Sequence, residues 1–136
     1  MNQKIKDRCI GMNDEFYNSI ALDFDGVIHS YESGWEGVTR TPDPPTKNVK
    51  QSLEIMKESG FNIKIYSNRA SKNEKGVQAI RKYMLNHDLP YDRIVKSGKP
   101  FAKVLVDDRA VRFPGEWSLF FLNKVLNYKP WHKINI

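Results

Sequence analysis

The segment Ile20–Val27 constrains the fold more than any other part of the sequence. It reads Ile-Ala-Leu-Asp-Phe-Asp-Gly-Val, so an apolar run leads directly into two carboxylates and then a glycine. An apolar run that ends at a turn residue is typical of a buried strand. Alternate side chains of a strand lie on the same face, so Asp23 and Asp25 start out on one side. The sequence therefore predicts a buried strand over residues 19–24 that ends in a pair of acids.

Two carboxylates held close together repel each other unless a cation lies between them. Oxygen ligands suit a hard ion, and a site with few carboxylates that also binds a phosphate suits Mg²⁺. Gly26 allows the chain to turn sharply or a ligand to approach closely. An isolated Asp-x-Asp-Gly sequence is also common in a simple turn after a strand. The functional interpretation therefore depends on partners elsewhere in the chain.

Composition favours one domain with its own core, since the chain has 136 residues of which 40% are hydrophobic and 28% are charged. No apolar run approaches the roughly 18 residues of a membrane span, and residues 1–12 lack the apolar stretch of a secretory signal. The single cysteine, Cys9, fits a reducing cytoplasm. The net charge of +6 is scattered along the chain and favours an anionic substrate. We expect a cytoplasmic single domain over residues 1–136, with its core at about 19–127.

Strand and helix patterns alternate after the first strand. A helix capped by Thr46 is expected to run to Ser59, a second to follow the capping-box sequence Ser71–Glu74 and end near His87, and a third to cover residues 116–126 with its leucines inward. Further strands are predicted over residues 61–66, 93–95 and 102–106. This alternation favours an α/β fold with a mainly parallel central sheet.

A long loop over residues 29–45, rich in Gly, Pro, Ser and Thr, contains Tyr31 and Trp35. Loops of this length in compact domains are usually functional. Two interpretations are open, because the sequence only places the loop directly after the two acids. It is either a flap over the site or a surface hairpin with Trp35 as its local core.

Polar residues also follow the other predicted strands. In parallel sheets the ligand site lies beyond the carboxyl ends of the strands, so residues from distant parts of the chain are expected to meet there. Each of them also has an ordinary structural role, in a capped turn, as a solvated charge or at a helix N-terminus. These residues are Ser67, Asn68 and Arg69 after the second strand, Lys99 before the fourth, and Asp107, Asp108 and Arg109 after the fourth.

Taken together, these motifs resemble those of the haloacid dehalogenase-like (HAD) phosphatases, which have an Asp-x-Asp-Gly, a Ser or Thr, a Lys and an acidic pair in this order. They read here Asp23-Phe24-Asp25-Gly26, Tyr66-Ser67-Asn68-Arg69, Lys99-Pro100 and Val106-Asp107-Asp108-Arg109. The resemblance covers residues 19–115. It implies a Rossmann-like three-layer sandwich in which the first and fourth strands are neighbours, so that Asp107 lies beside Asp23. The short loops imply a small member without a cap domain.

The resemblance also implies a reaction, the Mg²⁺-dependent hydrolysis of a phosphomonoester. Asp23 would attack phosphorus and form an aspartyl phosphate, which splits hydrolysis into two easier steps. Asp25 would protonate the leaving oxygen and then take a proton from the attacking water. Mg²⁺ would be held by the Asp23 carboxylate, the Asp25 carbonyl and Asp107, with Asp108 acting through water. An acid at the position of Asp25 argues against dehalogenation.

Other residues would bind the phosphate in the same resemblance. Ser67 would donate a hydrogen bond to a phosphoryl oxygen, and Lys99 would neutralise the charges of Asp23 and the phosphate. Lys103 is the alternative lysine, because Lys99 is close to the acidic pair in sequence. Arg69 and Arg109 add positive charge, and pairing with a neighbouring carboxylate is an equally good role for Arg109.

An open site suits a large phosphorylated substrate, and the positive charge favours a nucleotide or a nucleic-acid end. Tyr31 and Trp35 are placed to stack on a base.

Two rival interpretations are a non-catalytic HAD-fold module that binds metal and phosphate, and a response-regulator receiver domain. In receiver domains the phosphorylated Asp lies on the third strand and follows an acidic pair, which is the reverse of the order found here.

Overall fold

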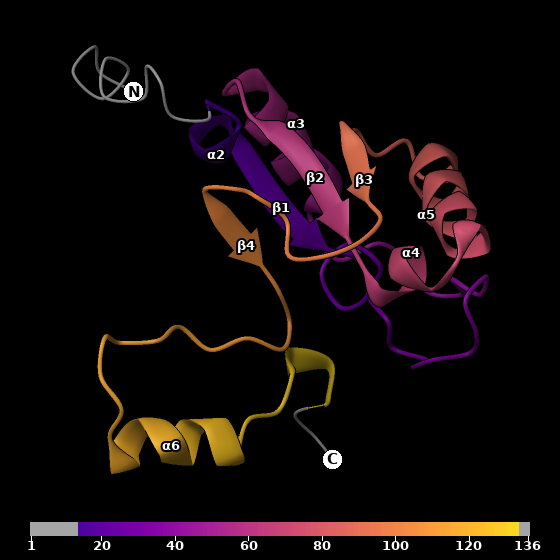
Figure 1. The fold of residues 1–136 in the computed structure, drawn as a ribbon. Coiled ribbons are helices and arrows are strands. Elements are labelled where there is room, and N and C mark those ends of the chain that lie inside the picture. Colours follow the sequence, from indigo (N-terminus) through magenta and orange to yellow (C-terminus); the bar gives the residue numbers. More distant parts are fainter. Residues whose placement is uncertain (1–13, 134–136) are drawn as a thin grey trace.

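The computed structural model describes residues 14–133, which form an α/β fold around a four-stranded parallel sheet (Figure 1). The strands are β1 (Ser19–Asp23), β2 (Asn62–Tyr66), β3 (Arg93–Val95) and β4 (Val104–Val106), and their order in the sheet is β3-β2-β1-β4. The helices are α2 (Asp14–Asn18), α3 (Val49–Glu58), α4 (Asn68–Lys72), α5 (Glu74–Asn86) and α6 (Leu119–Leu126), with a 3₁₀ turn η1 (Trp131–Lys133). The α/β fold with a parallel sheet is therefore confirmed. Cys9 lies outside the described residues.

The register of the sheet aligns the carboxyl ends of β2, β1 and β4. Leu22 of β1 pairs with Ile65 of β2 and with Val106 of β4, and all three strands are parallel. The residues that follow these positions, Asp23 and Asp107, therefore emerge side by side at one edge. The expected adjacency of the first and fourth strands is confirmed.

The main core lies on one face of the sheet. Ile63 and Ile65 of β2 are completely buried there, together with Leu53 of α3 and Ile80 of α5. Helices α3 and α5 thus cover the same face of the sheet. They do not cover the carboxyl ends of the strands, where the site lies. On the other face the Lys64 ammonium donates a hydrogen bond of 2.7 Å to the Phe101 carbonyl.

Three expectations about the helices are wrong. Helix α5 is capped by Asn73, whose side chain accepts from Gly76 N–H, because Ser71 belongs to the separate short helix α4. Helix α3 begins at Val49, and the Thr46 hydroxyl instead donates to the Val27 carbonyl at 2.6 Å. Helix α6 does not turn its leucines inward but lies apart from the sheet (Figure 1). None of the helices over residues 14–133 has the length and apolar character needed to cross a membrane.

Candidate active site

The carboxyl ends of β1 and β2 open onto two neighbouring cavities of about 290 and 320 Å³. Asp23, Ser67, Asn68 and Arg109 line both of them. The first is also lined by Trp35, which is half exposed. Seven of the site residues expected from sequence line the first cavity: Asp23, Asp25, Trp35, Ser67, Asn68, Asp108 and Arg109.

Three carboxylates converge at this edge. Asp23, Asp107 and Asp108 each offer an oxygen within 4.8 Å of the others. Burial raises the pKa of Asp23 to about 8, and a hydrogen bond with Asp108 and the charges of Asp107 and Asp108 act in the same direction. One oxygen of Asp108, Oδ1, is buried without a hydrogen-bond partner among the described residues. A cluster of hard oxygen donors with an unsatisfied buried carboxylate atom fits a divalent cation such as Mg²⁺.

The members of this cluster differ in part from the expected metal ligands. Asp108, which was expected to act through water, is itself a member of the cluster. The ligand expected from Asp25 is its backbone carbonyl, and the Asp25 carboxylate is engaged by Arg69. Tyr66, which pairs with Asp23 across the sheet, donates its hydroxyl hydrogen to Asp107 Oδ2 at 2.8 Å. Burial and this hydrogen bond raise the pKa of Tyr66, so the phenol stays a donor.

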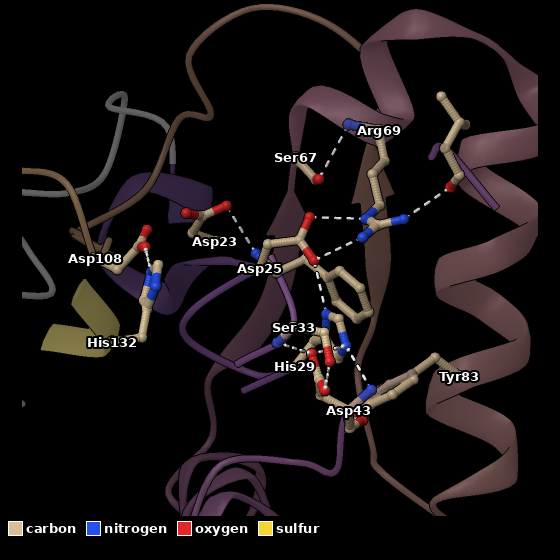
Figure 2. Close-up of polar contacts among 12 residues, drawn as sticks. Asp23, Asp25, His29, Ser33, Asp43, Ser67, Arg69, Tyr83, Asp108 and His132 are labelled. Carbon is tan, nitrogen blue, oxygen red and sulfur yellow. Dashed lines mark hydrogen bonds and ion pairs between the residues drawn. The ribbon is translucent and has the colours of Figure 1, made fainter. Parts of the chain in front are cut away.

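The Asp25 carboxylate is held by two buried cationic or polar side chains (Figure 2). Arg69 donates from Nε to Oδ2 at 2.7 Å and from Nη2 to Oδ1 at 3.0 Å. The His29 ring Nδ1 lies 2.8 Å from Oδ1, while Nε2 accepts from the backbone N–H of Asp43 at 3.1 Å. A neutral ring that accepts at Nε2 must donate at Nδ1. Burial alone would raise the pKa of Asp25, but the hydrogen bonds from His29 and Arg69 outweigh it and lower that pKa.

The loop over residues 29–45 is fixed against this pair. Arg69 Nη1 donates to the Gly37 and Val38 carbonyls, both at 2.9 Å. The Trp35 ring lies over the Arg69 guanidinium, with 4.8 Å from Cζ to the ring centroid, and Trp35 is 47% exposed. Trp35 is thus not the core of a surface hairpin. The loop contributes Tyr31 and Trp35 to the lining of the first cavity, and its role as a flap stays a prediction.

The structure does not bring the expected lysines into the site. Lys99 is exposed and lines neither cavity. The backbone N–H of Lys103 bonds to Ser19, at the amino end of β1, and its ammonium lies over Phe61, so Lys103 is at the wrong end of the sheet. Lys96 lines the second cavity and Lys72 lines the first. Lys96 directly follows β3, and the rule that sites lie beyond strand ends could have identified it.

Ser67 has two roles at the end of β2. Its Oγ accepts from the backbone N–H of Arg69 at 3.1 Å and so caps α4. The hydroxyl hydrogen remains available to a ligand in the cavities that Ser67 lines. The capped-turn role and the phosphate-binding role are therefore compatible.

The C-terminal residues also reach the site, which sequence patterns did not indicate. His132 Nε2 lies 2.6 Å from Asp108 Oδ2, and Trp131 Nε1 donates to the Gly26 carbonyl at 2.6 Å. The Tyr128 hydroxyl donates to the Asp108 carbonyl. We refer to Tyr128–Lys133 as the C-terminal strap. Figure 2 shows His132 of this strap beside Asp108, and its ring also packs edge-on against Tyr31 of the loop over residues 29–45, with 5.5 Å between ring centroids.

No protein-family model matches the chain, and no curated protein matches it. Among solved structures, a crystal structure described as an MCSG target from Vibrio cholerae is similar at 20% sequence identity. The alignment covers 79% of this chain and 95% of the other, with a TM-score of 0.45. A likeness of this size carries no weight for fold or function, so both rest on the residues described above.

Proposed function

We propose that this chain is a Mg²⁺-dependent phosphatase of the HAD type, which hydrolyses a phosphomonoester through an aspartyl phosphate on Asp23. The observation that carries the proposal is the convergence of Asp23, Asp107 and Asp108 beside a cavity lined by Ser67. The order of these motifs along the chain matches the resemblance found in the sequence. A bound Mg²⁺ would offset the repulsion among the three carboxylates and the phosphate, and so favour ionised Asp23.

Asp23 is oriented for nucleophilic attack. The backbone N–H of Phe24 donates to Asp23 Oδ1 at 2.8 Å, which fixes the carboxylate and leaves its second oxygen to attack phosphorus. A bond from that oxygen to phosphorus forms as the ester P–O bond breaks, and the leaving oxygen takes a proton. Water then attacks phosphorus, releases inorganic phosphate and restores Asp23. Throughout, the Ser67 hydroxyl donates to a phosphoryl oxygen.

Asp25 serves best in the second half of this reaction. Its carboxylate is kept ionised by Arg69 and His29, and an ionised carboxylate accepts the proton of the attacking water. In the first half the leaving oxygen takes its proton from the protonated form of Asp25, which the lowered pKa disfavours. Lys72, Lys96 and Arg109 line the cavities and supply positive charge for the phosphate.

The substrate class that we propose is a nucleotide or a nucleic-acid end. Tyr31 and Trp35 line the first cavity together with Lys72, so aromatic rings and a cation stand beside the reacting carboxylate. Aromatic rings of this kind stack on bases, and cations bind the phosphates next to them.

A non-catalytic module that binds metal and phosphate is the second candidate. Two observations favour it: the Asp25 carboxylate is fully engaged by Arg69 and His29, and Lys99 is outside the site. Both candidates predict Mg²⁺ binding, and they differ only in turnover.

Phosphate release from para-nitrophenyl phosphate with Mg²⁺ distinguishes them. For the phosphatase, Asp23→Asn should lower kcat about 10³-fold or more, because the nucleophile is lost. Asp88→Asn is the matched control, since the Asp88 side chain is 90% exposed and pairs with Lys50 outside the site. Mg²⁺ binding without phosphate release by the unaltered chain would establish the binding module instead.

A further inference from the structure

The C-terminal strap contacts two separate parts of the candidate active site. The Trp131 indole N–H donates to the Gly26 carbonyl at 2.6 Å, and the Tyr128 hydroxyl donates to the Asp108 carbonyl. Gly26 belongs to the acidic motif at the end of β1, and Asp108 belongs to the acidic pair that follows β4. The strap thus joins the two chain segments that supply the three converging carboxylates.

His132 of the strap also contacts the Asp108 carboxylate directly (Figure 2). Its Nε2 lies 2.6 Å from Asp108 Oδ2, and the two side chains are 5% and 4% exposed. An ionised carboxylate only accepts hydrogen bonds, so His132 Nε2 carries the hydrogen and donates it. Hydrogen bonds to a charged oxygen are short and strong. This contact therefore fixes the direction in which the Asp108 carboxylate is turned.

The second oxygen of Asp108 is left for a cation. Oδ1 is buried and has no hydrogen-bond partner within residues 14–133, although most buried polar atoms of side chains are paired. Asp108 offers an oxygen within 4.8 Å of oxygens of Asp23 and Asp107. We refer to these three residues as the acidic cluster. His132 is not a member of it, so His132 acts on a cation through Asp108.

Several neighbours hold the His132 ring in this orientation. The ring packs edge-on against Tyr31 and against Trp131, each at 5.5 Å between ring centroids. Gly26 leaves the necessary space, because a Cβ at this position would collide with Asp108 Oδ2 and meet His132 Nε2. The pairing of His132 with Asp108 thus depends on residues from distant parts of the chain.

We propose that the C-terminal strap positions Asp108 for Mg²⁺, with His132 holding the carboxylate and Tyr128 the backbone carbonyl. Asp108 Oδ1 then faces the cation together with the other carboxylates of the acidic cluster. Residues that hydrogen-bond a metal ligand commonly contribute a factor of about 10–100 to metal affinity. The proposal rests on the metal site of the proposed function but not on turnover, so metal binding tests it without an activity assay.

Titration calorimetry of the full chain with Mg²⁺ alone provides the test. His132→Phe keeps an aromatic ring but removes the donor, and should weaken Mg²⁺ binding about 10–100-fold. His132→Gln loses the ring but keeps a donor, and should recover most of the affinity. His87→Phe is the matched control, because His87 is exposed at the end of α5 and lines neither cavity. The control should bind Mg²⁺ as the unaltered chain does.

Tyr128→Phe provides a milder variant, whose fold circular dichroism checks together with that of the others. It removes only the hydroxyl that holds the Asp108 carbonyl, so Mg²⁺ binding should weaken about fivefold. This variant decides the question if His132→Phe does not fold, and unchanged affinity in it would then overturn the proposal.

Two results with folded His132 variants would also overturn the proposal. One is equal Mg²⁺ affinity for His132→Phe and the unaltered chain. The other is tighter binding by His132→Phe than by His132→Gln, because the ring would then act by packing and not as a donor. Both results leave the metal site itself standing. Absence of Mg²⁺ binding by the unaltered chain would instead overturn the metal site, and with it the proposed function.

Discussion

Replacing Arg69 by Met is expected to destabilise the fold strongly. Arg69 is 0% exposed and donates four hydrogen bonds, two to Asp25 and one each to the carbonyls of Gly37 and Val38. Removing one partner of a buried ion pair leaves the other charge buried without compensation, at a cost of about 3–5 kcal/mol. For a domain of this size such a loss corresponds to a fall in Tm of roughly 10–20 °C. Denaturant unfolding followed by circular dichroism measures it directly.

An exposed ion pair in the same chain serves as the control. Lys50 Nζ lies 2.9 Å from Asp88 Oδ2, about as close as Arg69 lies to Asp25, but the Lys50 and Asp88 side chains are 50% and 90% exposed. Lys50→Met is therefore expected to cost less than about 1 kcal/mol. The double variant Arg69→Met/Asp25→Asn should recover part of the lost stability, because the amide carries no charge. Equal costs for Arg69→Met and Lys50→Met would refute the reasoning, since burial would then make no difference.

The same pair makes stability depend on pH with a defined sign. The pKa of Asp25 is lower in the folded protein than its ordinary value of 3.8. The pairing therefore contributes fully above that ordinary value and is lost as the pH falls through the lower folded value. The Arg69→Met variant should lose this part of its acid sensitivity, because the lowering effect of the guanidinium is absent.

Two further variants test the site itself. Gly26→Ala would place a Cβ 2.3 Å from Asp108 Oδ2 at a φ of +86°, so we expect a clear loss of Mg²⁺ affinity by titration calorimetry. Gly60→Ala, at a φ of +91° with nothing within 4 Å, imposes similar backbone strain alone and should leave affinity intact. Trp35→Leu should raise KM for a nucleoside monophosphate about tenfold but not KM for glycerol phosphate. An equal rise for both substrates would exclude base stacking on Trp35.

Local patterns in the sequence were enough to predict the strands and the convergence of the acids. The apolar run before Asp23 defines β1, and a parallel sheet then places Asp107 at the same edge. The lysine was missed although its strand was predicted with the correct end. Lys96 directly follows β3 and lines the second cavity, whereas Lys99, three residues further on, was chosen from the resemblance alone. Helical periodicity likewise identified the apolar row of α6. Periodicity shows that such a row exists, but it does not show whether the chain covers it.

Contacts between distant residues were not predictable, and they also explain a local motif. An ion pair joins Asp25 to Arg69, 44 positions away in the sequence, and Trp131 donates a hydrogen bond to Gly26, 105 positions away. The sequence allows two reasons for Gly26 in the acidic motif: a sharp turn of the chain, or the close approach of another group. The structure shows both. The φ of Gly26 is +86°, and a Cβ there would meet Asp108 Oδ2 and His132 Nε2. Gly26 is therefore required by the C-terminal strap as much as by the turn that follows β1. A substitution there disturbs the acidic cluster through contacts made at the opposite end of the chain.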